Sequence, residues 1–322
     1  MCTPFWKNLK QAAIATPLGR PTTQKARRPA AVDQDYREPR WADKLSECWQ
    51  IGEPAAQRAL VKFLDDRVTT YPDNRDFPAV EATSHLSPHL RFGEISPRQI
   101  WQAASMAAQV APEKAGAIDK FLSELAWRDF SYHQLYHREN IAEAPMQSKY
   151  AGMQWREAQQ DLLRWQRGQT GLPIIDAGMR ELWATGYMHN RVRMLVASLL
   201  CKNLLLDWRL GEQWFWDCLV DSDVASNPAS WQWVAGSGLD AAPYFRIFNP
   251  VTQGGRFDAD GEYVRRWVPE LAALPDKWLH APWEAPTAVL KAAEVQIGRN
   301  YPPPIVDLKA SRARALEVAA AL

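Results

Sequence analysis

Residues 221–250 combine side chains that an ordinary core segment does not need together. The stretch holds carboxylates and amides, which fix polar ligand atoms, and indole rings, which stack on planar groups. These residues are Asp221, Asp223, Asn227, Asn249, Trp231 and Trp233. Core filling explains some of the 16 tryptophans in the chain, and stacking on planar ligands or bases is the competing explanation. The mixture favours a binding site.

Residues 83–88, with the sequence Thr-Ser-His-Leu-Ser-Pro, form a candidate anion site. Ser87 can cap a helix that starts at Pro88, which leaves backbone N–H groups and hydroxyls facing an anion. A plain helix cap explains the same residues without a ligand. Because the chain has neither a dinucleotide glycine fingerprint nor a Walker A sequence, a nucleotide cofactor needs another device of this kind for its phosphates.

A basic cluster opens another expected helix. Asn190, Arg191, Arg193 and Met194 lie close together in the sequence. Arginine in the first turn opposes the helix macrodipole, so two arginines there suggest an anionic partner, and a solvated basic turn is the alternative. We expect Asp221 to pair with Arg193, because a buried carboxylate without a cation costs free energy.

Glu124 and Trp127 are spaced to share one face of a helix. A carboxyl group beside an indole supplies a hydrogen-bonding group and a stacking plane in one wall. A core tryptophan beside a surface glutamate is the alternative from spacing alone.

Helices must position these groups, because apolar residues recur at helical spacing over most of the chain. Ala56, Leu60, Phe63 and Leu64 share one face of a helix that begins near Glu53. Period-two alternation between turn signals is absent, so the sequence predicts an all-α fold with few strands. Further helices are expected at residues 98–109 after an N-cap at Ser96, at 173–185 ending at Gly186, at 191–206 and at 212–220.

The bulk composition is that of an ordinary globular protein. A chain of 322 residues that is 47% hydrophobic and 23% charged allows one large domain or two medium ones. The net charge of +1 leaves any polyanion-binding surface as a local patch. The four cysteines lack CxxC spacing, so neither a metal site nor a disulfide framework is expected. No membrane-length apolar run or signal peptide is apparent, and a cytoplasmic location is expected.

Residues 221–250 resemble, almost continuously, the flavin-binding signature of the photolyase and cryptochrome family. The motifs around residues 83–88, 124–130 and 183–194 extend the resemblance, which is nearest to class I cyclobutane pyrimidine dimer photolyases. It implies the helical C-terminal domain of that family, with FAD as cofactor in its reduced, active form.

The resemblance also implies a domain organisation. Residues 41–310 are expected to form the FAD-binding catalytic domain, and residues 311–322 a short tail. Residues 1–40, which are basic and rich in proline, resemble an interdomain linker that forms no packed element of its own. The N-terminal α/β antenna domain, and with it an antenna chromophore, is not expected in this chain.

The resemblance implies a role for each matched residue. Glu124 would steady the dimer's carbonyl, Met194 would contact the damaged bases, and Asn227 would face the reactive ring nitrogen of the flavin. Trp231, Trp208 and Trp155 occupy the positions of an electron relay that runs from the flavin to the surface. Cofactor contacts are expected at Tyr71, Thr83, Ser84, Leu86, Ser87, Arg128, Asn190, Arg193, Asp221, Asp223 and Asn227. Contacts with DNA or the dimer are expected at Arg75, Trp127, Arg191, Met194 and Trp233.

The activity implied by the resemblance is light-driven DNA repair by a carbon–carbon lyase. Excited reduced FAD passes an electron to a pyrimidine dimer in UV-damaged DNA, the ring splits, and the electron returns. The protein is expected to act as a monomer on a dimer that is flipped out of the duplex. A cryptochrome-type blue-light photoreceptor is the alternative, and a flavin-free DNA-binding remnant is a third interpretation. Asn227 favours repair, because cryptochromes tend to carry an acid or a thiol at this position.

Overall fold

The computed structural model describes residues 2–19, 42–240 and 246–322. Within these ranges the chain is helical, and strand-like pairing is confined to a bridge between Ile297 and Tyr301, so the all-α prediction is confirmed. The α-helices are α1 (Cys2–Gln11), α2 (Asp43–Cys48), α3 (Glu53–Lys62), α4 (Tyr71–Asn74), α5 (Ser87–Arg91), α6 (Pro97–Val110), α7 (Ala115–His137), α8 (Gln159–Gln166), α9 (Pro173–Thr185), α10 (Asn190–Ser198), α11 (Trp208–Cys218), α12 (Ser226–Ala235), α13 (Pro250–Phe257), α14 (Glu262–Trp267), α15 (Asp276–Leu279), α16 (Thr287–Ala292) and α17 (Leu308–Ala320). Short π-helical turns are η2 (Phe63–Arg67) and η5 (Leu199–Asn203), and 3-10 turns are η3 (Pro112–Lys114), η4 (Ser148–Gly152), η6 (Pro269–Leu271) and η7 (Pro282–Glu284). None of the helices in these ranges has the length and apolar character needed to cross a membrane.

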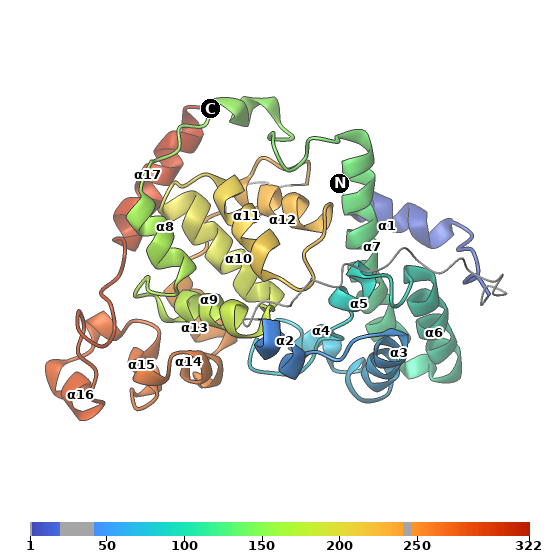
Figure 1. Cartoon of the computed structure of the whole chain (residues 1–322), viewed down its shortest axis with the longest axis horizontal. Coiled ribbons are helices and arrows are strands. Elements are labelled where there is room, and N and C mark those ends of the chain that lie inside the picture. Colours follow the sequence, from blue (N-terminus) through green and yellow to red (C-terminus); the bar gives the residue numbers. More distant parts are fainter. Residues whose placement is uncertain (1, 20–41, 241–245) are drawn as a thin grey trace, which may run out of the picture.

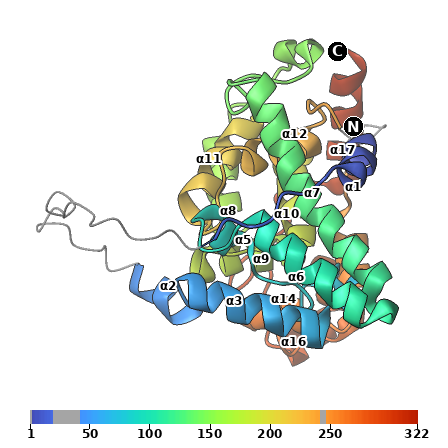
Figure 2. The same ribbon diagram turned by 90° about the vertical axis from the view of Figure 1, so that its right-hand side faces the viewer.

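Two main hydrophobic clusters support the two sides of the molecule in Figure 1. The smaller cluster joins α3, α6 and α7 around Phe63 and Ile100. The larger one joins α8 to α12 and α14 around Trp165 and Val192. Helix α7 runs lengthwise through the view in Figure 2, and α12 packs against α7, α10 and α11. The side chains of these four helices can therefore meet between the two clusters.

Local capping signals fix several helix ends where the sequence predicts them. The Ser96 hydroxyl accepts a hydrogen bond from the Gln99 backbone N–H at 3.2 Å, and the Gln99 side chain accepts one from the Ser96 N–H at 2.8 Å. This reciprocal capping box starts α6. Gly186 ends α9 with φ of 69°, where a Cβ would lie 2.6 Å from Val220. Glycine is therefore required at that turn.

The predicted cap at Ser87 is wrong. Helix α5 starts at Ser87 itself, its N-cap residue is Leu86, and no side chain caps it. The hydroxyl of Ser84 instead accepts a hydrogen bond from the Leu86 N–H at 3.4 Å. A turn within the motif, rather than a capped helix start, therefore places its hydroxyl groups.

Two other predicted helices have different bounds. The helix expected at residues 191–206 is α-helical only as α10 and continues as the π-helical turn η5. The helix expected at residues 212–220 is part of α11, which starts at Trp208 because the Asp207 carboxylate accepts a hydrogen bond from the Arg209 N–H at 3.0 Å.

The N-terminal segment differs from the expected linker. Residues 2–11 form α1, which packs on α7 with the rings of Phe5 and Phe130 5.4 Å apart. The Cys2 N–H donates to the Asp240 carboxylate at 2.8 Å. The prediction that no packed element forms here is therefore wrong for residues 2–11, and residues 20–40 lie outside the described part.

Helix α17 runs through the predicted domain boundary at residue 310. Asn203 donates a hydrogen bond of 2.8 Å to the buried hydroxyl of Ser311, and Ala315 is fully buried. Residues 311–320 are therefore packed against the helical body. The division at residue 310, like the start of the domain at residue 41, stays a prediction.

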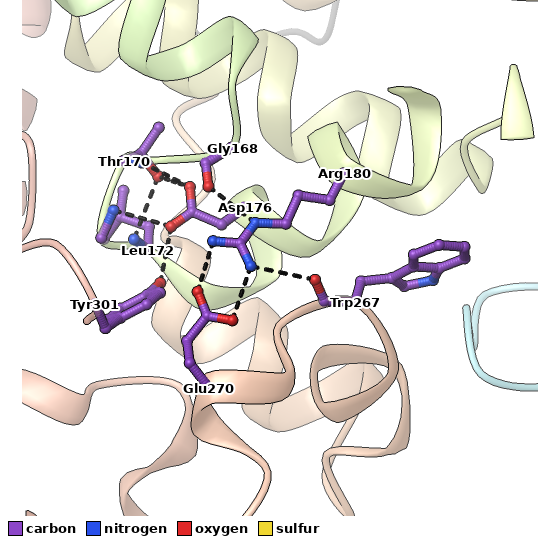
Figure 3. Close-up of polar contacts among 9 residues, drawn as sticks. Gly168, Thr170, Leu172, Asp176, Arg180, Trp267, Glu270 and Tyr301 are labelled. Carbon is purple, nitrogen blue, oxygen red and sulfur yellow. Dashed lines mark hydrogen bonds and ion pairs between the residues drawn. The ribbon is translucent and has the colours of Figure 1, made fainter. Parts of the chain in front are cut away.

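Buried polar contacts attach the C-terminal segment to α9, as Figure 3 shows. Asp176 is fully buried and accepts hydrogen bonds from the Thr170 N–H at 2.7 Å, the Thr170 hydroxyl at 2.6 Å and the Tyr301 hydroxyl at 2.8 Å. Arg180 on the same helix contacts both oxygens of Glu270 at 2.9 and 2.7 Å. These bonds fix α9, which leads directly to the turn before α10.

Candidate cofactor and substrate cavity

A cavity of about 520 Å³ lies where α5, α7, α10, α11 and α12 meet. This volume lies within the range that small-molecule and cofactor sites occupy. Most of the residues predicted for the site share its wall: Tyr71, Thr83, Ser84, Leu86, Ser87, Glu124, Trp127, Arg128, Asn190, Arg193, Met194, Asp221, Asp223, Asn227, Trp231 and Trp233. Arg75, Arg191, Trp208 and Trp155 lie outside the wall.

The predicted pair between Arg193 and Asp221 is confirmed. The Arg193 Nη2 atom lies 3.1 and 2.9 Å from the two carboxylate oxygens of Asp221, whose side chain is 5% exposed. The Arg193 Nε atom also donates to the Met188 carbonyl at 2.7 Å. The pair links α10 to the segment before α12, so it sets the spacing of two cavity walls.

Asp223 is held by donors on both of its oxygens. It accepts hydrogen bonds from the Tyr132 hydroxyl at 2.6 Å and from the backbone N–H groups of Ala225 at 3.0 Å and Ser226 at 2.8 Å. Burial raises the pKa of Asp223, but these hydrogen bonds outweigh burial and hold it below its usual value. An ionised acceptor therefore faces the cavity at the start of α12.

Asn227 is buried on the first turn of α12, and Glu212 of α11 holds its amide group. The Asn227 Nδ2 atom donates to the Glu212 carbonyl at 3.0 Å and to the Glu212 carboxylate at 2.9 Å. Burial raises the pKa of Glu212, and the hydrogen bond from Asn227 opposes that rise. The orientation of the predicted catalytic amide therefore depends on a neighbouring acid.

Glu124 on α7 lies between two cations. It forms ion pairs with Arg75 and with Lys120, the latter at 2.8 Å. Burial raises the pKa of Glu124, but the contacts with Arg75 and Lys120 lower it below its usual value. The Arg75 guanidinium also lies over the Tyr71 ring at 5.2 Å. Arg75 is thus bound to Glu124, and its contact with DNA or the dimer stays a prediction.

The aromatic and basic residues predicted for DNA divide into two groups. Trp127 lines the cavity with 37% of its surface exposed, and Trp233 also lines it. Arg191 points elsewhere, because it pairs with Asp76 at 2.6 Å and lies over the Phe257 ring at 4.3 Å. The structure brings the predicted stacking residues to the cavity but leaves Arg191 beside it.

The three predicted relay tryptophans differ in burial and in whether they line the cavity. Trp231 lines the wall and Trp208 does not; both are 2% exposed, whereas Trp155 is half-buried. Trp231 packs edge-on against Phe215, with ring centroids 5.0 Å apart. The order of the three along a relay and the relay role itself stay predictions.

Sequence reasoning missed several cavity residues, including His85, Arg91, Gln134 and Tyr187. His85 lies inside the motif of residues 83–88 and has a positive φ of 52°, which is uncommon outside glycine. Tyr187 lies in the motif before α10, so its position in the sequence could have indicated it. Arg91 and Gln134 lie outside the compared motifs, and no sequence signal singled them out.

The chemistry of the wall fits a flavin nucleotide. The hydroxyls of Thr83, Ser84 and Ser87 lie at one part of the wall, while Phe121 and Leu125 supply apolar surface. In the described chain, the buried Trp231 Nε1 and Ser222 Oγ atoms of the wall have no hydrogen-bond partner. A buried donor without a partner is expensive, so a polar ligand would stabilise this wall.

The fold and the cavity together define a helical protein that binds a nucleotide cofactor. Comparison with known proteins gives the family. Residues 121–321 match the FAD binding domain of DNA photolyase, and the chain belongs to this family. FAD is accordingly its cofactor.

Individual relatives agree with this assignment. The chain is 47% identical to the deoxyribodipyrimidine photo-lyase of Agrobacterium fabrum, over 99% of this chain and 68% of that protein. A crystal structure of a class III photolyase from Agrobacterium tumefaciens superposes with a TM-score of 0.93 at 47% identity, over all of this chain and 68% of that one. Cryptochrome-2 of Arabidopsis thaliana is 40% identical over 83% of this chain and 45% of that protein. The class I assignment stays a prediction.

Proposed function

We propose that this chain is the catalytic, FAD-binding part of an enzyme that splits cyclobutane pyrimidine dimers in DNA under light. The supporting observation is that the predicted cofactor residues and the predicted dimer residues line one cavity. Asp223 and Asn227 lie on its wall together with Glu124, Trp127 and Met194. A flavin and a flipped base in this cavity would be close enough for direct electron transfer.

The bound, reduced flavin would supply one electron under blue or near-ultraviolet light and recover it after the dimer has split. The chain's own residues hold the two partners in place. Ionised Asp223 accepts from cofactor hydroxyl groups, and Trp127 offers a plane for stacking at the mouth. Unstacking a base costs a few kcal/mol, and least at a damaged site, so a stacking partner favours the flipped dimer.

Glu124 has a specific role in this scheme. Because Arg75 and Lys120 both contact its Oε1 atom, Glu124 is ionised and acts as an acceptor. An ionised carboxylate cannot donate a hydrogen bond to the dimer's carbonyl. We therefore propose that the Oε2 atom of Glu124 accepts a hydrogen bond from the imide N–H of a base. The donor to the carbonyl is then a neighbouring cation or amide, such as Asn190 on the same wall.

The test begins with the visible spectrum of the purified protein, followed by a repair assay on thymine-dimer DNA in reductant, in light and in darkness. Absence of flavin bands would overturn the cofactor assignment. Replacing Trp127 with alanine should weaken binding of dimer-containing DNA by about 5- to 150-fold, because stacking contributes about 1–3 kcal/mol per base. The matched control is Trp183→Ala, since Trp183 is 58% exposed and lies off the wall.

A blue-light photoreceptor is the second candidate, because the chain is 40% identical to Arabidopsis cryptochrome-2 over 83% of its length. Flavin binding without light-dependent repair would favour it. Asn227 supports the repair function instead, since its side chain is an amide and not an acid. We also propose that the protein acts as a monomer in the cytoplasm; gel filtration with and without DNA tests the first part.

A further inference from the structure

Two arginines from distant parts of the chain bind the turn that follows η5. The Arg156 Nη1 atom donates to the Leu204 carbonyl at 2.9 Å, and the Arg314 Nη2 atom of α17 donates to the Asn203 carbonyl at 2.7 Å. Because these carbonyls belong to consecutive residues, the two guanidinium groups are held close together. Arg156 is exposed and Arg314 is half-buried, so a positive charge of two groups gathers at one place that solvent reaches.

Carboxylates neutralise this arginine pair only in part. Asp161 of α8 pairs with Arg156 at 3.4 Å, and among the described residues no acid forms an ion pair with Arg314. Burial, followed by repulsion from Arg156, lowers the pKa of Arg314. The Arg314 Nε atom is buried and has no hydrogen-bond partner in the described chain. The pair therefore combines a net positive charge with an unused donor, and a small anion would satisfy both.

Trp155, the predicted outer end of the relay, belongs to the same part of the structure. It precedes Arg156, whose N–H donates to the Leu205 carbonyl at 2.7 Å. Its half-buried ring packs against the hydrophobic cluster that contains Leu205 and Ala315, and Ala315 follows Arg314 on α17. An anion on the arginine pair would thus lie near an indole that solvent partly reaches.

We propose that Arg156 and Arg314 form a binding site for a small anionic one-electron reductant, of which ascorbate is the example, and that this reductant returns an electron to Trp155. The inference rests on the proposed function, in which Trp155 gives up an electron toward the cofactor and becomes a radical cation. The ascorbate monoanion gives one electron to the indole, which restores neutral Trp155. It releases one proton to water and leaves as the ascorbyl radical anion.

Electrostatics explains why the reductant should be negatively charged. Two guanidinium groups repel the positive charge of an oxidised Trp155, and an anion between them offsets this repulsion. The same groups raise the local concentration of an anion, whereas a neutral reductant gains neither effect. Added salt should therefore slow the reaction with ascorbate and leave the reaction with a neutral hydroquinone almost unchanged.

The first experiment measures anion binding in darkness, by NMR of the holoprotein with nitrogen-labelled arginine. Titration with sulfate, and then with ascorbate, should shift the Arg314 Nε–H signal until it saturates. Arg314→Gln should weaken binding about fivefold, followed on the Arg156 signal, and Asp161→Asn should strengthen it about twofold. The matched control is Arg312→Gln, because Arg312 is exposed two positions away on another face of α17 and its loss changes the net charge equally.

The second experiment follows the decay of the tryptophan radical after a light flash, with ascorbate or with hydroquinone. Arg314→Gln should slow the reaction with ascorbate about fivefold and change the reaction with hydroquinone by less than about twofold. Arg312→Gln should leave both rates within about twofold of the original. If Arg314→Gln does not fold, Arg156→Gln removes the other member of the pair and should have the same effect.

An Arg314 signal that does not saturate would overturn the anion site. Equal slowing of both reductants, or no slowing of either, in a folded variant would overturn the selection by charge. A radical decay that is the same in Trp155→Phe would overturn the delivery of the electron to Trp155. Absence of light-dependent repair would instead overturn the proposed function, and the titration in darkness would still decide whether the arginine pair binds anions.

Discussion

Replacing Asp221 with alanine should destabilise the protein more than the loss of any surface ion pair. The change removes both acceptors of the Arg193 Nη2 atom and leaves a guanidinium whose side chain is only 24% exposed. Charges about 4 Å apart interact by about 4 kcal/mol at an effective dielectric constant of 20. Loss of one partner from a buried pair costs about 3–5 kcal/mol. Because Arg193 keeps its hydrogen bond to Met188, we expect a loss at the lower end, about 3 kcal/mol.

Asp161→Ala is the matched control for this prediction. Asp161 pairs with Arg156 at 3.4 Å, and the two side chains are 24% and 38% exposed. Exposed pairs contribute about 0–1 kcal/mol, so the control should lose less than about 1 kcal/mol. The free energy of unfolding comes from urea denaturation, with the slope m checked for constancy.

The amount of bound FAD must be controlled in the same assay, because a ligand that binds the folded state raises the apparent free energy of unfolding. Both variants are therefore unfolded with and without added FAD. Combining Asp221→Leu with Arg193→Met should recover much of the loss, since no unpaired charge then stays buried. If Asp221→Ala loses no more than Asp161→Ala, or if the double variant is no more stable than Asp221→Ala, the reasoning from the unpaired guanidinium is refuted.

Three further predictions concern pH, buried hydrogen bonds and electron transfer. Burial raises the pKa of Glu181 from 4.5 to about 7, so the folded protein keeps a proton that the unfolded chain loses. The free energy of unfolding of the original protein, relative to that of the Glu181→Gln variant, should therefore fall by up to about 3 kcal/mol as the pH rises from about 4.5 to about 7. Urea unfolding at each pH measures this difference, and a difference that does not change with pH would contradict the prediction. Asp176→Asn should cost about 3 kcal/mol, because an amide offers one acceptor where the carboxylate accepts several bonds, whereas Tyr301→Phe should cost about 1–2 kcal/mol by thermal or urea unfolding; equal losses would contradict this. Trp208→Phe should slow photoreduction of oxidised FAD in flash photolysis yet spare repair by protein that is already reduced, and equal loss of both would refute the relay.

The sequence predicts those parts of the fold that short-range chemistry determines. Helix α9 has the expected bounds because proline suits its first turn and Gly186 adopts the left-handed conformation at its end. The sequence does not predict helix α1, because residues far away in the sequence stabilise it: Cys2 forms a hydrogen bond with Asp240, 238 positions along the chain. The packing of α17 likewise depends on the contact between Asn203 and Ser311. Helices whose stability comes from remote partners leave little local signal.

The candidate site shows the same division. The motifs predict which residues gather at the cavity, because each matched segment is short and its sequence specifies which side chains lie next to one another. They do not predict which charged residues neutralise each other. Arg75 lies on the segment after α4, and its partner Glu124 lies on α7, so only the tertiary packing reveals that the pair exists. The role of Glu124 beside the dimer's carbonyl stays a prediction.

Three of the four arginines that the sequence predicts for the cofactor or DNA form close ion pairs with carboxylates. Arg75 pairs with Glu124, while Arg191 and Arg193 pair with Asp76 and Asp221. A phosphate would have to compete with these acids, whereas backbone N–H groups and hydroxyls carry no counter-charge that must first be displaced. The arginines thus act mainly as fixed ion-pair links between segments around the cavity. Such an arrangement recognises its ligands through preformed shape and oriented dipoles, and it costs little reorganisation when they bind.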